Sequence, residues 1–354
     1  MKRRAFIKVA AGAAAGGYAL TLEQVLAQSK PDATVEKVAG MPRRSLGRTG
    51  QRVSIVGFPG LALNPVPQEE CTKAIHQAFD KGVNYYDVAP AYGNGVCETK
   101  MGIGLQGLDR SKLFLACKTK KRDRDGARQE LENSLKLLKT DHFDLYQMHH
   151  LVTVPEVKQA FGPGGAIETF LKAKEEGKIK YIGFSAHTTK AALEAMKTFR
   201  YDTVMFPISF SEYLARGFGK DVLSLAKEQG AGVISIKPLS RGAWPKDVEQ
   251  TRKWWYRCME TQDDVTLSLR FAWSQPGVAA GIPPSFLDLV EKSIEAAKDD
   301  RPIAADDLKR LQELAAGTGS IFASEEQRAA TASLHPHGHH PDEPGNGDCP
   351  YAMC

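Results

Sequence analysis

The sequence lacks several features that would assign it to common protein classes. No glycine-rich GxGxxG turn follows the first apolar run, which argues against a Rossmann dinucleotide domain. The six cysteines stand at positions 71, 97, 117, 258, 349 and 354, too widely spread for a disulfide framework. Residues 9–20 are apolar but too short and too rich in glycine for a membrane-spanning helix. We therefore expect a protein with no stable membrane anchor.

An excess of charge of one sign is also lacking in most of the chain. The formal net charge is +5, of which +3 falls in residues 1–27, so the remainder is nearly neutral. Proteins that bind nucleic acids usually carry concentrated positive charge, so we expect no nucleic-acid partner. The hydrophobic residues make up 42% of 354 residues, which is enough for one large core.

Residues 1–27 have the three parts of an export signal. Lys2-Arg3-Arg4 is a basic start, residues 9–20 form an apolar stretch, and Val25-Leu26-Ala27 offers small residues before a cleavage point. The adjacent arginines resemble a twin-arginine signal, which predicts the twin-arginine export machinery as a partner and a periplasmic location. The alternative is a basic N-terminus on a cytoplasmic protein.

From about residue 50, short apolar runs alternate with amphipathic segments of helical periodicity. Strand–helix alternation predicts a parallel sheet, and eight repeats favour a closed (β/α)8 TIM barrel over an open doubly wound sheet. The eight predicted strands are 53–57, 83–87, 113–118, 143–148, 179–185, 203–206, 232–236 and 278–282. The predicted divisions are a linker at 28–42, one barrel domain at 43–320 and a flexible tail at 321–354. Within the barrel domain we expect a hairpin at 43–52 and an inserted loop or helix at 241–262, whose aromatic residues either wall a pocket or pack an extra helix.

Three successive predicted strands end in polar residues, at intervals of 31 positions: Asp87, Lys118 and His149. In a barrel of parallel strands, these ends meet at one rim, where active sites lie. Tyr92 follows Asp87 in the next loop. A nearby ammonium stabilises phenolate and so lowers the pKa of a tyrosine, which would allow Tyr92 to act as a general acid beside Lys118. Asp87 could hold Lys118 in place, and His149 could orient a carbonyl.

These residues and their surroundings resemble the aldo-keto reductase family over roughly residues 43–300. The matching segments are 46–50, Asp87 with Tyr92-Gly93 and Glu98, Lys118, 144–149, 183–185 and 237–239. The resemblance implies that Asp87, Tyr92, Lys118 and His149 are the catalytic residues and Tyr92 is the general acid. It also implies hydride transfer between a nicotinamide cofactor and a carbonyl or alcohol, with the cofactor lying across the barrel mouth.

The resemblance further implies a set of cofactor-binding residues, although this chain departs from the family pattern at several of them. The expected residues are Ser185, Lys237, Pro238, Leu239, Ser285 and Ser293. The family's Asn after the serine of the fifth strand is replaced by Ala186-His187, so His187 either substitutes for it or caps the next helix. The cation expected after Ser285 for a 2′-phosphate is missing, so both NADP and NAD are candidate cofactors.

The C-terminal tail contains four histidines and two cysteines within residues 335–354. Their spacing matches no closed metal site, so we predict a flexible tail with incidental histidines and assign no metal ligands. Two alternative functions stay open. One is a lyase that uses Lys118 or Lys237 as a Schiff-base nucleophile. The other is a cofactor-binding regulatory protein on the same fold.

Overall fold

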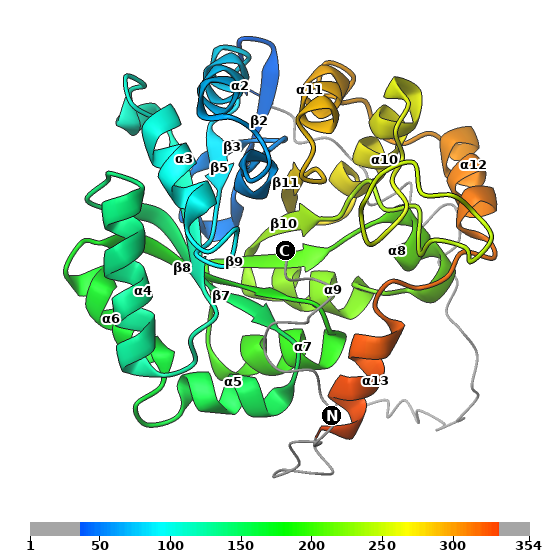
Figure 1. Cartoon of the computed structure of the whole chain (residues 1–354). Helices are drawn as coiled ribbons and strands as arrows, with labels where there is room; N and C mark the ends of the chain where they lie inside the picture. The colour runs from blue at the N-terminus through cyan, green and yellow to red at the C-terminus, as the bar shows by residue number, and fades with distance from the viewer. Residues whose placement is uncertain (1–35, 333–354) are drawn as a thin grey trace, which may run out of the picture.

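The computed structural model describes residues 36–332, which form a barrel of eight parallel strands surrounded by helices (Figure 1). Each strand pairs with the next one along the chain. The strands are β4 (Phe58–Pro59), β5 (Tyr85–Asp87), β6 (Phe114–Thr119), β7 (Phe143–Leu151), β8 (Ile179–Ala186), β9 (Thr203–Pro207), β10 (Gly232–Ile236) and β11 (Val278–Ile282). A parallel bridge between Val56 and Gly281 joins the two ends of the sheet. The predicted (β/α)8 barrel is confirmed.

Helices cover the outside of the barrel, and several begin at a side chain that accepts a main-chain N–H bond. They are α2 (Gln68–Asp80), α3 (Val96–Gly104), α4 (Arg124–Leu137), α5 (Val154–Phe161), α6 (Ala166–Glu175), α7 (Thr189–Thr198), α8 (Phe210–Arg216), α9 (Lys220–Gln229), α10 (Gln262–Trp273), α11 (Leu287–Ala296), α12 (Ala305–Ala315) and α13 (Ala323–Thr331). Thr153 and Glu156 form a capping box at α5, and Thr188 caps α7 by accepting from the Ala191 N–H. These caps fix where the chain leaves the barrel rim.

An antiparallel three-stranded sheet precedes the barrel and closes its bottom. It contains β1 (Glu36–Val38), β2 (Met41–Ser45) and β3 (Arg52–Ser54). Leu46 and Val53 are fully buried and pack in the barrel interior with Leu145 and Ile234. The predicted hairpin is therefore present, but residues 36–42 are strand and turn where we expected linker. Their polar, proline-containing sequence carries no strand periodicity, and the antiparallel pairing of residues 36–38 with 41–43 is what makes them extended.

Two further sequence boundaries are corrected. The predicted strand 53–57 is divided, because β3 pairs within the hairpin while residues 55–57 bond to β11 and β4 pairs with β5. Residues 323–331, expected to be part of a flexible tail, form α13, which packs on α7 (Figure 1). Phe322, directly before this helix, is buried. The predicted export signal at 1–27 and the histidine- and cysteine-rich residues from 335 on lie outside the described residues.

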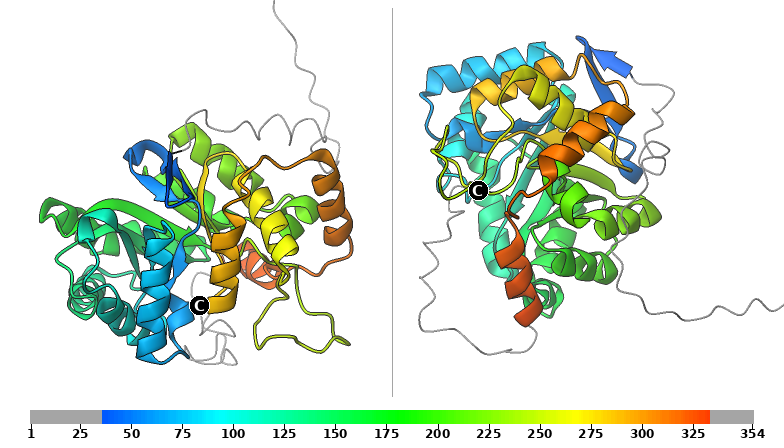
Figure 2. Two further views of the ribbon diagram at one scale, coloured as in Figure 1. Left: turned by 90° about the horizontal axis from the view of Figure 1, so that it is seen from above. Right: turned by 90° about the vertical axis from the view of Figure 1, so that its right-hand side faces the viewer.

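The insertion predicted at 241–262 is a loop between β10 and α10. It extends beyond the helices at one end of the barrel, as the yellow-green segment of Figure 2 shows. Main-chain pairing of Ser240 with Cys258 draws its two ends together. Within residues 36–332, no helix is both long enough and apolar enough to cross a membrane.

Candidate active site

The four residues predicted to be catalytic meet at the carboxyl ends of three neighbouring strands. Asp87 ends β5, Lys118 lies near the end of β6 and His149 lies near the end of β7. Lys118 Nζ donates to Asp87 Oδ1, and it also donates to the Tyr92 hydroxyl at 3.0 Å. The rings of Tyr92 and His149 meet edge to face with centroids 5.6 Å apart. The structure thus brings all four predicted side chains together.

Burial and charge hold this cluster in a defined protonation state. Lys118 is fully buried and Asp87 nearly so. Although burial opposes the ammonium, Asp87 and Tyr92 raise the pKa of Lys118 above its ordinary value. A Schiff-base nucleophile must be a neutral amine. Since Lys118 stays charged, the geometry supports a residue that acts through its charge on Tyr92 and gives no support to the lyase alternative at this lysine.

His149 is set up as a neutral hydrogen-bonding group. Burial, followed by the charge of Lys118, lowers the pKa of His149 well below its usual value. A neutral imidazole beside Tyr92 can hydrogen-bond an oxygen atom without competing for the proton that Tyr92 carries. Tyr92 can therefore offer a proton, and His149 a hydrogen bond, to the same oxygen atom.

A cavity of about 70 Å³ lies beside this cluster. Asp87, Tyr92 and His149 line one side, and Trp254 and Tyr256 from the loop after β10 line another. The loop aromatics therefore form part of the pocket wall, which was one of the two alternatives left open by the sequence. Because the aromatic rings narrow the cavity, this loop is positioned to select substrates by size.

The predicted cofactor-binding residues divide into two groups. Ser185, Lys237 and Ser285 line the cavity together with Met205 and Ile236. Pro238 and Leu239 are buried behind it, with Leu239 in the hydrophobic core. Ser293 is fully buried, and its hydroxyl donates to the Leu289 carbonyl one turn earlier in α11. The side chains of Pro238, Leu239 and Ser293 do not line this cavity, and their role in cofactor binding stays a prediction.

His187 lines the catalytic cavity and does not cap the next helix. Thr188, rather than His187, caps α7. The His187 ring is buried, with Nε2 at 3.0 Å from Lys237 Nζ and Nδ1 at 3.4 Å from the Glu325 carboxylate. Both ring nitrogens therefore face protein groups, and the substitution of His187 for the family's asparagine stays a prediction. Sequence reasoning missed Glu325 because its helix lies in the segment expected to be flexible.

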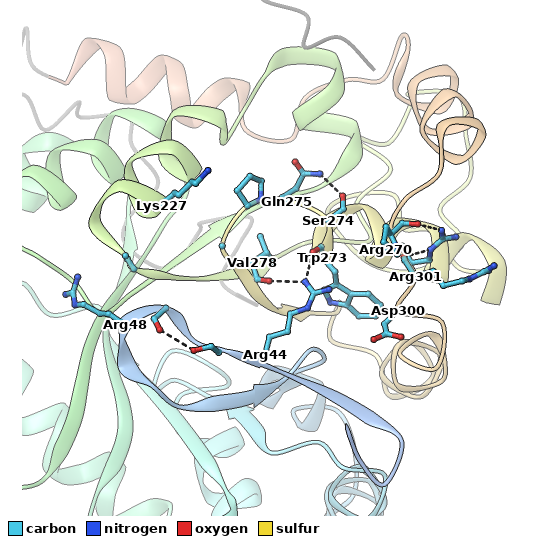
Figure 3. A pocket seen from close by; sticks show the side chains of 17 residues that line it. Arg44, Arg48, Lys227, Arg270, Trp273, Ser274, Gln275, Val278, Asp300 and Arg301 are labelled. Atoms are coloured by element: carbon cyan, nitrogen blue, oxygen red, sulfur yellow. Dashed lines mark hydrogen bonds between the residues drawn. The ribbon is translucent and has the colours of Figure 1, made fainter. Parts of the chain in front are cut away.

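A larger cavity, about 510 Å³, lies at the opposite end of the barrel (Figure 3). Its lining is rich in arginine, but these side chains are used within the protein. Arg44 donates to the carbonyls of Trp273 and Val278, and Arg270 donates to those of Arg301 and Pro302. The cavity contains none of the four predicted catalytic residues and faces the amino ends of the strands. We therefore place the active site at the smaller cavity.

Two cations lie near the loop that follows β11, where the family pattern places the group that binds a 2′-phosphate. Arg252 makes a bidentate ion pair with Asp288 at 2.9 and 2.6 Å, and its guanidinium lies 4.8 Å from the Phe286 ring. Lys292 donates to the Glu260 carbonyl at 2.7 Å. The sequence missed Arg252 because it is distant along the chain from Ser285. Its charge is already balanced by Asp288, so the structure favours neither NADP nor NAD at this point.

Comparison with curated proteins shows related oxidoreductases. The chain is 30% identical to L-galactose dehydrogenase of Arabidopsis thaliana over 213 residues, covering 56% of this chain and 66% of that protein. It is 26% identical to the uncharacterized oxidoreductase YqkF of Bacillus subtilis over 309 residues, covering 77% of this chain and 96% of YqkF. The first of these matches spans slightly less than two thirds of its relative.

Solved structures share the fold. The holo form of aldo-keto reductase AKR11C1 from Bacillus halodurans superposes with a TM-score of 0.65 at 24% identity, covering 81% of this chain and 99% of that one. An aldo-keto reductase from Klebsiella pneumoniae in complex with NADPH gives a TM-score of 0.60 at 20% identity, covering 77% and 94%. Residues 55–316 match the profile of the aldo/keto reductase family. With most of its barrel inside that match, the chain belongs to the aldo/keto reductase family.

Proposed function

We propose that this protein transfers a hydride between a nicotinamide dinucleotide, NADP(H) or NAD(H), and a carbonyl or alcohol substrate, with Tyr92 as the general acid. One observation carries the proposal. The Tyr92 hydroxyl lies 3.0 Å from the buried ammonium of Lys118, on the wall of a cavity that His149 also lines. This arrangement delivers a proton to an oxygen atom, which is the partner step of hydride transfer to a carbonyl.

The roles of the side chains follow from their charges. In the direction of reduction, Tyr92 gives its hydroxyl proton to the carbonyl oxygen. The Lys118 ammonium stabilises the phenolate that remains, and Asp87 holds Lys118 within reach. Neutral His149 donates a hydrogen bond to the same oxygen and orients the carbonyl. A reduced nicotinamide, when bound, supplies the hydride.

The cavity contains groups suited to the cofactor that we propose. Ser185 and Ser285 offer hydroxyl groups, Met205 and Ile236 offer an apolar surface for a ring, and Lys237 offers a positive charge for phosphate. The structure of an aldo-keto reductase from Klebsiella pneumoniae in complex with NADPH supports a cofactor of this kind. Arg252 is the residue that would meet a 2′-phosphate, in exchange for its pairing with Asp288.

The test is a fluorescence titration of the full chain with NADH and with NADPH, followed by assays with a panel of aldehydes, ketones and alcohols. We expect saturable binding of at least one cofactor and its oxidation by at least one aldehyde. Borohydride treatment in the presence of a carbonyl compound should leave no covalent adduct. Absence of binding to both cofactors would refute the proposal. Tight binding without turnover would favour a regulatory role.

We also propose export by the twin-arginine route, which rests on the sequence of residues 1–27 alone. An enzyme exported in folded form with its cofactor must keep that cofactor bound after export. Comparing the amount of this protein, and of the nicotinamide bound to it, in periplasmic and cytoplasmic fractions would test both export and cofactor retention.

Trp254 provides a prediction about substrate size. Its side chain is nearly buried, lines the cavity and packs edge to face on Phe286. We expect Trp254→Ala to raise kcat/KM for a bulky aromatic ketone relative to a small aldehyde by at least about tenfold, because the wall recedes. Val248→Ala is the matched control, since Val248 lies in the same loop but is exposed. An unchanged ratio of the two kcat/KM values would mean that the loop does not limit substrate size.

A further inference from the structure

Two histidines and a glutamate outside the catalytic group converge at the same rim of the barrel. His150 follows His149 in β7, His187 follows β8 directly, and Glu325 comes from α13. One potential ligand atom from each residue lies within 4.8 Å of the others. The His150 and His187 rings are 4.3 Å apart between centroids. From these residues, we propose that His150, His187 and Glu325 form a binding site for a divalent transition-metal ion such as Zn²⁺.

The distances within the cluster suit metal ligands better than hydrogen bonds. Glu325 Oε1 lies 3.5 Å from His150 Nε2, and Glu325 Oε2 lies 3.4 Å from His187 Nδ1. Ordinary N–H···O bonds are shorter, about 2.9 Å. Two ligands about 2.0 to 2.1 Å from a tetrahedral metal ion are about 3.3 Å from one another. The two N···O separations are therefore close to the spacing of atoms that share one metal ion.

The polar atoms of the cluster also lack other partners in the described protein. Both Glu325 oxygens and His150 Nε2 are buried without a hydrogen bond there. Glu325 is 5% exposed, and a buried carboxylate without hydrogen bonds is costly. A cation between the three side chains would satisfy these atoms at once.

The types of ligand suit a transition metal. Neutral imidazole and ionised carboxylate are the forms that bind metals. Two nitrogens and one carboxylate favour Zn²⁺ and similar ions over Mg²⁺ or Ca²⁺, which prefer oxygen ligands.

A bulge near the end of β7 sets the directions of the His149 and His150 side chains. An irregularity in the pairing of β7 with β8, between Met148 and Leu151, places one extra residue in β7. At this bulge, His150 adopts a left-handed conformation with φ of 59°, and its N–H donates to the Ser185 hydroxyl. At the bulge, two residues of β7 lie opposite one residue of β8, which changes the direction of their side chains. His149 lines the catalytic cavity, and His150 lies beside Glu325.

Lys237 connects this cluster to the catalytic cavity. It lies 3.0 Å from His187 Nε2, and it lines the cavity. If His187 binds metal through Nδ1, the proton of its neutral ring moves to Nε2. Nε2 then becomes a donor and can no longer accept a hydrogen bond from Lys237. Metal binding and the Lys237–His187 hydrogen bond therefore exclude each other. On the proposed function, an occupied site would change the hydrogen bonding of a lysine that lines the cofactor cavity.

The test measures metal binding directly in the full chain. The tail must not contribute, so His335, His337, His339 and His340 are changed to Ala, and Cys349 and Cys354 to Ser, with no histidine tag. After treatment with a chelator, this protein is titrated with Co²⁺, whose visible absorption reports ligand nitrogen and oxygen, and its Zn²⁺ content is measured by mass spectrometry. We expect one metal ion per chain. If this protein binds neither ion, the proposal is overturned.

Three variants and a control assign the site. Glu325→Gln keeps the shape of the side chain and should weaken Co²⁺ binding at least about 100-fold, as should His150→Ala. Lys237→Met should tighten binding several-fold, because it removes a competing proton donor and a positive charge. His142→Ala is the matched control, since His142 pairs with Asp141 at the surface, outside the cluster. Equal affinity in Glu325→Gln and the parent protein would refute the site, and this readout does not depend on activity.

Discussion

Replacing Tyr92 by phenylalanine is expected to lower kcat for carbonyl reduction at least about 100-fold while the dissociation constant of the nicotinamide cofactor stays nearly unchanged. The substitution removes one oxygen atom, which is the atom that receives a hydrogen bond from Lys118 at 3.0 Å. A positioned general acid contributes roughly 10²- to 10⁴-fold to a rate. Without the hydroxyl, the carbonyl oxygen must take its proton from water.

Steady-state kinetics with an electron-poor aromatic aldehyde, together with cofactor titration by fluorescence, measure the two quantities separately. Tyr181→Phe serves as the control, because the Tyr181 hydroxyl binds the Thr49 carbonyl at the opposite end of the barrel. A Tyr92→Phe enzyme that retains full kcat would disprove the proposed proton transfer. A loss confined to cofactor affinity would reassign Tyr92 to binding.

Replacing Lys118 by methionine is expected to affect both activity and stability strongly. The ammonium is fully buried and is paired with Asp87, so its removal leaves a buried carboxylate without its cation. Removing one partner of a buried pair typically lowers the free energy of unfolding by about 3 to 5 kcal/mol. We expect a clear fall in Tm by calorimetry, and a loss of kcat comparable to that of Tyr92→Phe, because the phenolate loses its stabilising charge.

A double variant separates the two effects. Adding Asp87→Asn to Lys118→Met removes the uncompensated negative charge, so most of the lost stability should return. Activity should stay low, since no ammonium faces Tyr92. If the double variant recovers activity together with stability, then Lys118 is a structural residue, and its charge has no part in the reaction.

The sequence predicted the barrel and the catalytic group for the same physical reason. Parallel strands that follow one another along the chain place their carboxyl ends at one rim, so Asp87, Lys118 and His149 could be brought together from strand ends alone. Tyr92 could be added because it follows Asp87 by five positions. These inferences need only the order of the strands and their last residues, both of which are local properties of the sequence.

Other features depend on contacts between segments that are distant in sequence. The hairpin of residues 36–45 becomes part of a sheet because residues 43–45 pair with β3, and α13 is held by its packing on α7. Ser293 faces the core because of the turn of α11 on which it falls, although its sequence position suggested a cofactor contact. A pattern of residue types does not show the register of a helix relative to its neighbours.

The sequence by itself determined the barrel, its strand order and the four residues that carry out the proposed proton transfer, because each follows from short-range periodicity and strand ends. The tertiary structure decided where the 241–261 loop lies, placing Trp254 and Tyr256 on the cavity wall. It also decided that His150, His187 and Glu325 face one another, through a bulge in β7 and a helix 138 positions after His187. Both outcomes depend on packing between distant segments, whose energies a local sequence pattern does not contain.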